Sequence, residues 1–223
     1  MYANTKTWNP FVGCRFKCKY CIPSFQAQLK RRKHACTQCY NYIPHTHSER
    51  LARIPGAKII FVAGDGDISF CPTEFTRKII EQIKKHNKRC PYKTYYFQSK
   101  NPAYFEQFLK ELPENVALVT TLETNRDEGY DLVSKAPKPS VRYRAFANLN
   151  YSNKIVTIEP LMDFDLETFT QWMLNLKPRY VWIGFNTKRS RVHLNEPEMS
   201  KVTALITTLE SNGIKVKKKN LRR

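Results

Sequence analysis

Three cysteines lie close enough together to bind one metal group. Cys14, Cys18 and Cys21 have the spacing C-x3-C-x2-C. Three thiolates on one short loop can hold three irons of a [4Fe–4S] cluster. Clusters that only carry electrons usually have four cysteine ligands, so three would leave one iron open to a small molecule, as catalytic metal sites keep a free position. A structural zinc knuckle and free buried thiols are the alternatives.

A second C-x2-C pair, Cys36 and Cys39, is followed by His45 and His47. Two cysteines and two histidines form a common zinc ligand set. The usual H-x3–5-H spacing is absent, however, and an H-x-H pair looks strained as a chelate. A zinc or auxiliary metal site is therefore one interpretation, and reduced cysteines in a lid are the other. Both make segment 22–57 a lid or second metal segment.

Short apolar, β-branched runs alternate with helical patterns along the chain. The runs are 58–63, 94–98, 116–121, 155–158 and 180–184, with a short final strand near 214–216. The helical patterns are 72–83, 101–112, 165–176 and 196–209. This alternation predicts βαβ units and a parallel sheet, either doubly wound or an incomplete (β/α) barrel. Both folds bind ligands at the carboxyl ends of the strands.

The cysteine spacing, with aromatic Tyr20 before the last cysteine and a strand ahead of the loop, resembles the signature of the radical SAM superfamily. The resemblance implies a partial (β/α)6 barrel of parallel strands. It also implies a [4Fe–4S] cluster on Cys14, Cys18 and Cys21 whose open iron binds S-adenosylmethionine (SAM). The reduced cluster would cleave SAM to a 5′-deoxyadenosyl radical, with Tyr20 near the adenine.

More narrowly, the chain resembles a phage-associated, radical-SAM-like family of unassigned activity, sometimes called the three-Cys-motif proteins. The matching pieces lie at 7–14, 47–51, 61–67 and 157–160. Because that family has no settled reaction, the resemblance supports a cofactor and a fold rather than a substrate.

Radical SAM proteins usually carry a Gly-Gly-Glu-like stretch after the second strand, which holds the amino group of SAM. The stretch here departs from that pattern and reads Gly64, Asp65, Gly66, Asp67. Glycines let the backbone approach a ligand, and Asp67 can accept from an ammonium. The other candidates for SAM binding follow later strands: Glu123 and Asn125 for the ribose hydroxyls and the carboxylate, and Glu159 in the pocket.

The chain is strongly basic, with 38 Lys and Arg against 19 Asp and Glu and a formal charge of +19. Such a charge favours a polyanionic partner, and nucleic acid is our prediction; general solubility is the alternative. No apolar leader or membrane span is evident, so a cytoplasmic protein without disulfides is expected. The roles of Cys71 and Cys90 stay open.

These observations predict a single radical SAM domain over 1–223, with a basic tail at 215–223. It would abstract hydrogen from a substrate such as DNA or RNA and take electrons from an external donor. One alternative is a radical SAM enzyme acting on a protein, a peptide or a small metabolite. Another is a zinc-stabilised nucleic-acid-binding module without catalysis. The sequence does not set the oligomeric state.

Overall fold

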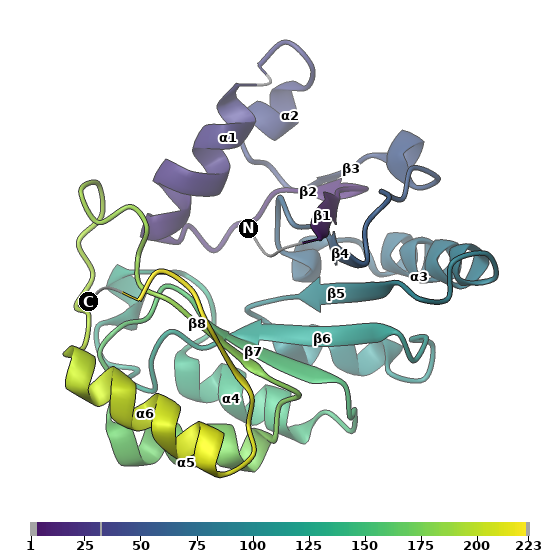
Figure 1. Ribbon diagram of the computed structural model, residues 1–223. Coiled ribbons are helices and arrows are strands. Elements are labelled where there is room, and N and C mark those ends of the chain that lie inside the picture. The colour runs from purple at the N-terminus through teal and green to yellow at the C-terminus, as the bar shows by residue number, and fades with distance from the viewer. Residues whose placement is uncertain (1–3, 32, 222–223) are drawn as a thin grey trace.

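The structure is a computed structural model that describes residues 4–31 and 33–221. Its main element is a seven-stranded sheet in the order β1-β4-β5-β6-β7-β8-β9, in which all neighbours are parallel. Figure 1 shows this sheet curled, with helices outside it, as a half-barrel. The predicted partial barrel is therefore confirmed. The strands are Thr5–Trp8 (β1), Ile59–Val62 (β4), Thr94–Gln98 (β5), Val116–Thr121 (β6), Lys154–Ile158 (β7), Val181–Ile183 (β8) and Val216–Lys218 (β9).

Both faces of the sheet are packed. Along β6, Val116 and Leu118 belong to the large core under the helices, whereas Ala117 and Val119 belong to a small cluster on the inner face. Successive side chains of a strand point to opposite faces, so burial on both produces the unbroken apolar runs of the sequence.

Four longer helices cover the outer face (Figure 1). They are Thr73–Asn87 (α3), Pro139–Asn148 (α4), Leu166–Leu176 (α5) and Met199–Ser211 (α6). The connection from β5 to β6 is instead a 3-10 helix, Pro102–Phe108. Its buried residues Pro102, Phe105 and Phe108 recur every three positions, which is the period of a 3-10 helix and explains why the expected α-helix over 101–112 is absent.

The last strand is close to its expected position, and one helix was not expected. The final strand predicted near 214–216 is present as β9, which begins at Val216, lies within the predicted basic tail and makes the seventh strand of the sheet; residues 222–223 of that tail lie outside the described residues. Helix α4 was not among the expected helices, because its apolar residues lack a clear helical spacing.

The segment 22–57 lies outside the sheet, and its last part packs against the core through Leu51, Ile54 and Ala57. Strand Phe11–Val12 (β2) pairs antiparallel with His45–Thr46 (β3), and two short helices, Ala27–Lys30 (α1) and Thr37–Tyr40 (α2), lie between them in the chain. Figure 1 shows α1 and α2 rising above the sheet, on the side away from α4, α5 and α6. The part of the segment with α1 and α2 therefore lies on the opposite side of the sheet from these helices.

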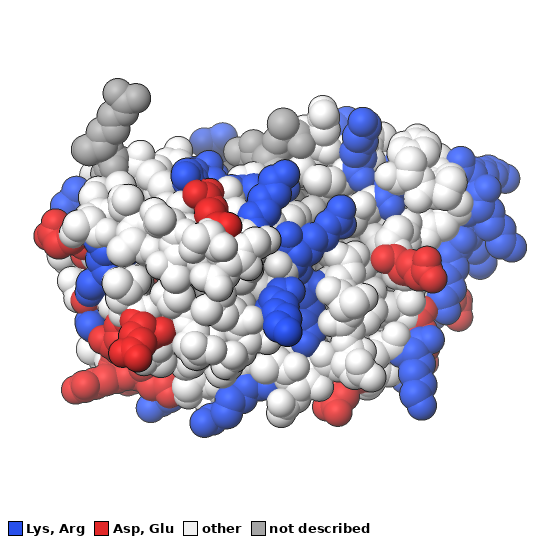
Figure 2. All heavy atoms as spheres, turned by 60° about the horizontal axis from the view of Figure 1, so that its bottom comes forward, with Lys and Arg blue, Asp and Glu red and all other residues white. Residues whose placement is uncertain are grey.

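The basic residues gather unevenly on the surface. Figure 2 shows Lys and Arg side chains as a band across the middle of the face viewed and as a group at one end, with acidic side chains mainly at the other end. Within the described residues, no helix has both the length and the apolar character required to cross a bilayer.

Candidate active site

The cysteine loop is fixed to the loop that follows β4. Gly13 and Gly66 form an isolated parallel bridge, in which Gly13 N–H donates to the Asp65 carbonyl at 3.2 Å and Asp67 N–H to the Gly13 carbonyl at 3.1 Å. A Cβ added at Gly66 would lie 2.5 Å from the Gly13 carbonyl oxygen. Glycine at 66 therefore permits the close approach of the two loops.

Each of the three thiols on this loop has a polar neighbour. Burial raises the pKa of Cys14 and of Cys21, because it penalises the thiolate. The neighbours are Phe16 N–H, which donates to Cys14 Sγ at 3.4 Å, Ser134 Oγ, which lies 3.0 Å from Cys18 Sγ, and the Tyr42 hydroxyl oxygen, which accepts from the Cys21 thiol at 3.8 Å.

This donor set fits an iron–sulfur cluster better than a single ion. Cys18 and Cys21 are near enough to Cys14 to raise its pKa further. A single ion needs ligand atoms that converge on one point. In the described part of the chain, the ligand atoms that all lie within 4.8 Å of one another belong to other residues and not to these three cysteines. Thiolates of a cluster bind different irons and need not converge on one point. Buried and half-buried thiols with polar groups beside their sulfurs are also the surroundings that tune such clusters.

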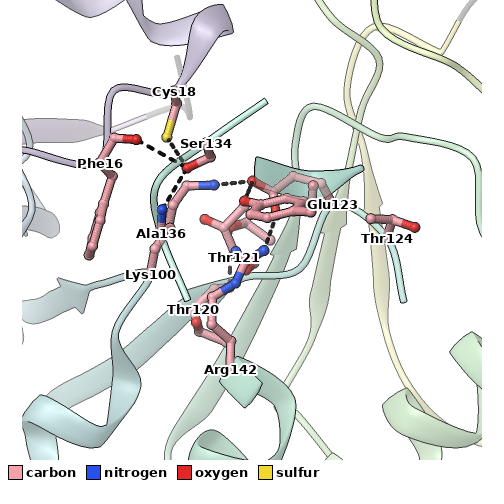
Figure 3. Close-up of polar contacts among 12 residues, drawn as sticks. Phe16, Cys18, Lys100, Thr120, Thr121, Glu123, Thr124, Ser134, Ala136 and Arg142 are labelled. Atoms are coloured by element: carbon pink, nitrogen blue, oxygen red, sulfur yellow. Dashed lines mark hydrogen bonds and ion pairs between the residues drawn. The ribbon is translucent and has the colours of Figure 1, made fainter. Parts of the chain in front are cut away.

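Glu123, which follows β6, is the centre of a buried ionic network (Figure 3). Its carboxylate accepts from Arg142 Nη2 at 2.8 Å and from Tyr130 O–H at 3.0 Å, and it also contacts Lys100 Nζ and Tyr20 O–H. Tyr20 belongs to the cysteine loop and Lys100 to the end of β5. The network therefore joins the predicted adenine-side aromatic to two strand ends.

The charges in this network hold each other ionised. Burial alone would raise the pKa of Glu123, but Arg142 and Lys100 outweigh it and lower that pKa to about 2. Burial alone would lower the pKa of Lys100, and Glu123 reverses that effect. Two cations therefore face one carboxylate, which leaves an excess positive charge beside the cysteine loop.

Glu123 makes the stability of the protein depend on pH in the acid range. Because its folded-state pKa is about 2 and the ordinary value is 4.5, its contribution is complete above pH 4.5 and is lost as the pH falls through the folded-state pKa. We expect the stability difference between wild type and Glu123→Gln to shrink in urea titrations from about pH 6 to about pH 3. The same substitution at an exposed position, Glu128→Gln, serves as control. A difference that does not vary with pH would contradict an ionised Glu123.

The stretch 64–67 is held by neighbours on both sides. Asn9 donates from Nδ2 to Asp65 Oδ2 at 2.8 Å and accepts from Asp65 N–H at 3.0 Å. Buried Asp67 accepts from Ser99 Oγ at 2.6 Å and from Lys100 N–H at 2.8 Å. Asp67 thus links the loop after β4 to the loop after β5 and sets the backbone that carries Lys100.

Asn125 and Glu159, the remaining two SAM candidates, lie outside the Glu123 network. Both polar atoms of the Asn125 side chain bond to Asp165 at the start of α5, at 2.8 and 3.2 Å. Glu159 pairs with Lys219 Nζ at 3.0 Å, just past β9. Asn125 therefore tethers α5, while Glu159 holds the end of the chain against the strand ends.

Sequence reasoning missed Arg142, Tyr130 and Ser134, all of which contact the candidate site. Arg142 is fully buried in α4, a helix without a clear amphipathic pattern. Tyr130 begins a short 3-10 helix in the connection after β6, and Ser134 follows that helix. Helix α4 carries two arginines, the buried Arg142 and the exposed Arg144, and nothing in their spacing indicates which of them points inward.

The four candidates for a second metal, Cys36, Cys39, His45 and His47, do lie together. Cys71 and Cys90 lie apart from both groups. Burial raises the pKa of the Cys71 thiol to about 11, so it is a protonated core residue. Cys90 Sγ accepts a weak contact from Tyr92 O–H at 3.9 Å near the surface.

No protein-family model and no curated protein matches the sequence. Solved structures do match. A spore photoproduct lyase complexed with dinucleoside spore photoproduct is 12% identical, with a TM-score of 0.64 over 96% of this chain and 76% of the lyase. A radical SAM methyltransferase from Sphaerobacter thermophilus is 14% identical, with a TM-score of 0.64 over 100% of this chain and 68% of that chain. A lyase variant with bound AdoMet and dinucleoside spore photoproduct has 12% identity and a TM-score of 0.52 over 94% of this chain and 61% of its own.

At these identities the likeness is one of fold. The half-barrel of this chain is similar to that of radical SAM enzymes, as the cysteine motif led us to expect. The narrower resemblance to the phage-associated family stays a prediction.

Proposed function

We propose that the protein is a radical SAM enzyme whose cluster is held by Cys14, Cys18 and Cys21. The observation that carries the proposal is the position of these thiols, on a loop bridged to the loop after β4 in a half-barrel of radical SAM type. When bound, the cluster supplies the electron that cleaves SAM and so generates a 5′-deoxyadenosyl radical, with an external donor as the source of electrons.

The chain's own residues would bind and orient SAM at the strand ends. Lys100 offers a cation to the SAM carboxylate, and Glu123 positions both Lys100 and Tyr20. The backbone of 64–67 lies beside the cysteine loop, where its carbonyls can accept from the SAM ammonium. Glu159 would border the same pocket from the far strands.

The inner face of the half-barrel suits a substrate that approaches from the side of the strand ends. Most of this face is apolar and is formed by the small cluster that includes Ala117 and Val119. Nearer the carboxyl ends of the strands it is polar: the hydroxyls of Thr121 and Thr157 are hydrogen-bonded at 2.9 Å, and Gln98 donates to Thr121 at 3.1 Å. A buried polar layer of this kind can orient a substrate by hydrogen bonds while apolar walls exclude water.

Nucleic acid is the substrate class that the surface favours. A cleft of about 430 Å³ lies beside the cysteine loop, and it combines cations with apolar side chains, as phosphates and bases require. The similar lyase was solved with a dinucleoside, which agrees with this choice. The cleft is lined by Lys19, Ile22, Pro23, Arg191, Val192 and His193.

Anaerobic reconstitution tests the proposed function. The protein, supplied with iron, sulfide and a reductant, is expected to bind about four irons and to release 5′-deoxyadenosine from SAM. Stoichiometric zinc without iron would favour a nucleic-acid-binding module without catalysis and would overturn the enzyme. Iron binding without any SAM cleavage would overturn it as well.

Charge reversal in the cleft tests the substrate class. We expect Lys19→Glu/Arg191→Glu to weaken binding of a single-stranded oligonucleotide and to reduce the slope of log K against log salt by about 1 for each phosphate that the variant no longer neutralises. The control Lys84→Glu/Lys85→Glu makes the same charge change on exposed positions of α3. If both double variants weakened oligonucleotide binding equally, only the overall charge would matter. That result would favour a protein, a peptide or a small metabolite as substrate.

A further inference from the structure

Four side chains of the segment between β2 and β4 converge on one point. The ligand atoms of Cys36, Cys39, His45 and His47 all lie within 4.8 Å of one another. His45 Nε2 is 3.4 Å from each of the two sulfurs, and His47 Nε2 is 3.2 Å from Cys39 Sγ. A tetrahedral ion with bonds of about 2.3 Å to sulfur and about 2.0 Å to nitrogen would set such edges near 3.5 Å.

The local backbone explains how each pair is brought together. Cys36 precedes the short helix α2, and Cys39 N–H donates to Cys36 Sγ at 3.4 Å, so the C-x2-C turn gathers both sulfurs. His45 lies in β3, and the backbone stays extended up to His47. Side chains two positions apart on extended backbone share a face. The H-x-H spacing would strain a chelate on a helix. On this extended backbone it allows both histidines to bind the same ion.

The hydrogen bonds of the two imidazoles leave both Nε2 atoms aimed at the same place. His45 Nδ1–H donates to the Ile43 carbonyl at 2.7 Å, and His47 Nδ1–H donates to Glu49 Oε1 at 2.8 Å. In neutral imidazoles so bonded, each Nε2 carries a lone pair. These two nitrogens lie 2.8 Å apart, where two lone pairs repel unless a cation lies between them.

We infer that Cys36, Cys39, His45 and His47 form a structural zinc site. Two thiolates and two imidazoles in tetrahedral arrangement, with all four positions filled by protein, are typical of structural zinc. Glu49 adds the carboxylate partner that zinc-binding histidines commonly have.

The zinc site supports the cysteine loop. Tyr42 lies between Cys39 and His45, accepts from Cys14 N–H at 3.4 Å through its carbonyl and reaches Cys21 with its hydroxyl. A Cβ at Gly13 would lie 2.4 Å from the backbone of Ile43, so the two loops are in direct contact. This supporting role rests on the proposed function, but the zinc site itself does not.

Metal analysis of matched variants tests the inference. The wild type produced with zinc is expected to hold about one zinc per chain, to keep it in Cys14→Ala/Cys18→Ala/Cys21→Ala and in the control Cys90→Ser, and to lose it in Cys39→Ser. Zinc lost from the triple variant but kept in Cys39→Ser would overturn the site. Iron is measured separately, so failure of the cluster leaves this result unaffected.

A second variant removes the risk that Cys39→Ser simply fails to fold. Glu49 is 58% exposed, so Glu49→Gln should fold normally and weaken zinc binding by about 10- to 100-fold in competition with a chelator. Chelator-stripped wild type should also take up Co²⁺ with the visible spectrum of a tetrahedral site with thiolate ligands. A folded wild type that binds neither Zn²⁺ nor Co²⁺, or a Glu49→Gln variant with unchanged affinity, would contradict the inference.

Discussion

Replacing Cys18 by alanine is expected to leave the reconstituted protein without a stable cluster and to reduce 5′-deoxyadenosine release by more than about 100-fold, because even residues behind a metal ligand cost 10- to 100-fold when they are removed. Cys18 is the most buried of the three thiols, and Ser134 Oγ lies 3.0 Å from its sulfur. Its loss would remove one of the three proposed protein ligands of the cluster. Iron content and the yield of 5′-deoxyadenosine under reducing, anaerobic conditions measure the effect.

Cys71→Ala is the matched control for this change. Cys71 is 4% exposed and Cys18 is 7% exposed, so both variants lose a buried thiol of similar accessibility. The Cys71 sulfur lies outside the cysteine loop, and its variant should keep both iron and SAM cleavage. If the two variants lost iron to the same extent, the three-cysteine ligand set would be wrong.

The fold could be predicted from the sequence because its signals are local. The strands are visible as unbroken apolar runs, since each residue of β6 is buried whichever face it points to. The cysteine spacing is likewise readable within the single segment 14–21. Local signals are too weak to distinguish the two kinds of helix. Because 3-10 and α-helices differ by only a fraction of a residue per turn, the pattern of residues 102–108 is compatible with either.

The candidate site was harder to predict because its partners are distant in sequence. Glu123 was found as a polar residue at a strand end, but its partners Tyr20, Lys100 and Arg142 come from separate loops and a helix. Nothing in the local pattern says that a charged residue in α4 points inward. The pairing becomes apparent only when the sheet places the end of β6 beside that helix.

The two histidines of the proposed zinc site show how an interpretation depends on the assumed backbone. An H-x-H spacing looks unfavourable if the reference is the helical spacing of zinc fingers. The same spacing becomes suitable once β3 and its extension are known. Glu49, two residues further on, then has a role that no spacing rule assigned to it.

Arg142→Met is expected to lower the free energy of unfolding by about 3–5 kcal/mol, the usual cost of removing one partner from a buried ion pair. Arg142 and Glu123 are both fully buried, and the guanidinium also lies over the Tyr130 ring at 4.9 Å from its centroid. Methionine preserves much of the volume, so the loss reports mainly that the buried carboxylate keeps only one of its two cationic partners, Lys100. Urea unfolding, followed by circular dichroism, measures it.

Arg126→Met is the matched control, because Arg126 also pairs with carboxylates, those of Asp163 and Asp165, but is 41% exposed. Exposed pairs contribute about 0–1 kcal/mol, so this variant should be nearly as stable as wild type. The double variant Arg142→Met/Glu123→Gln should be less destabilised than the sum of its single changes, since both single changes remove the same interaction between Arg142 and Glu123. Strict additivity would mean that the two residues do not form the coupled pair on which the positions of Lys100 and Tyr20 depend.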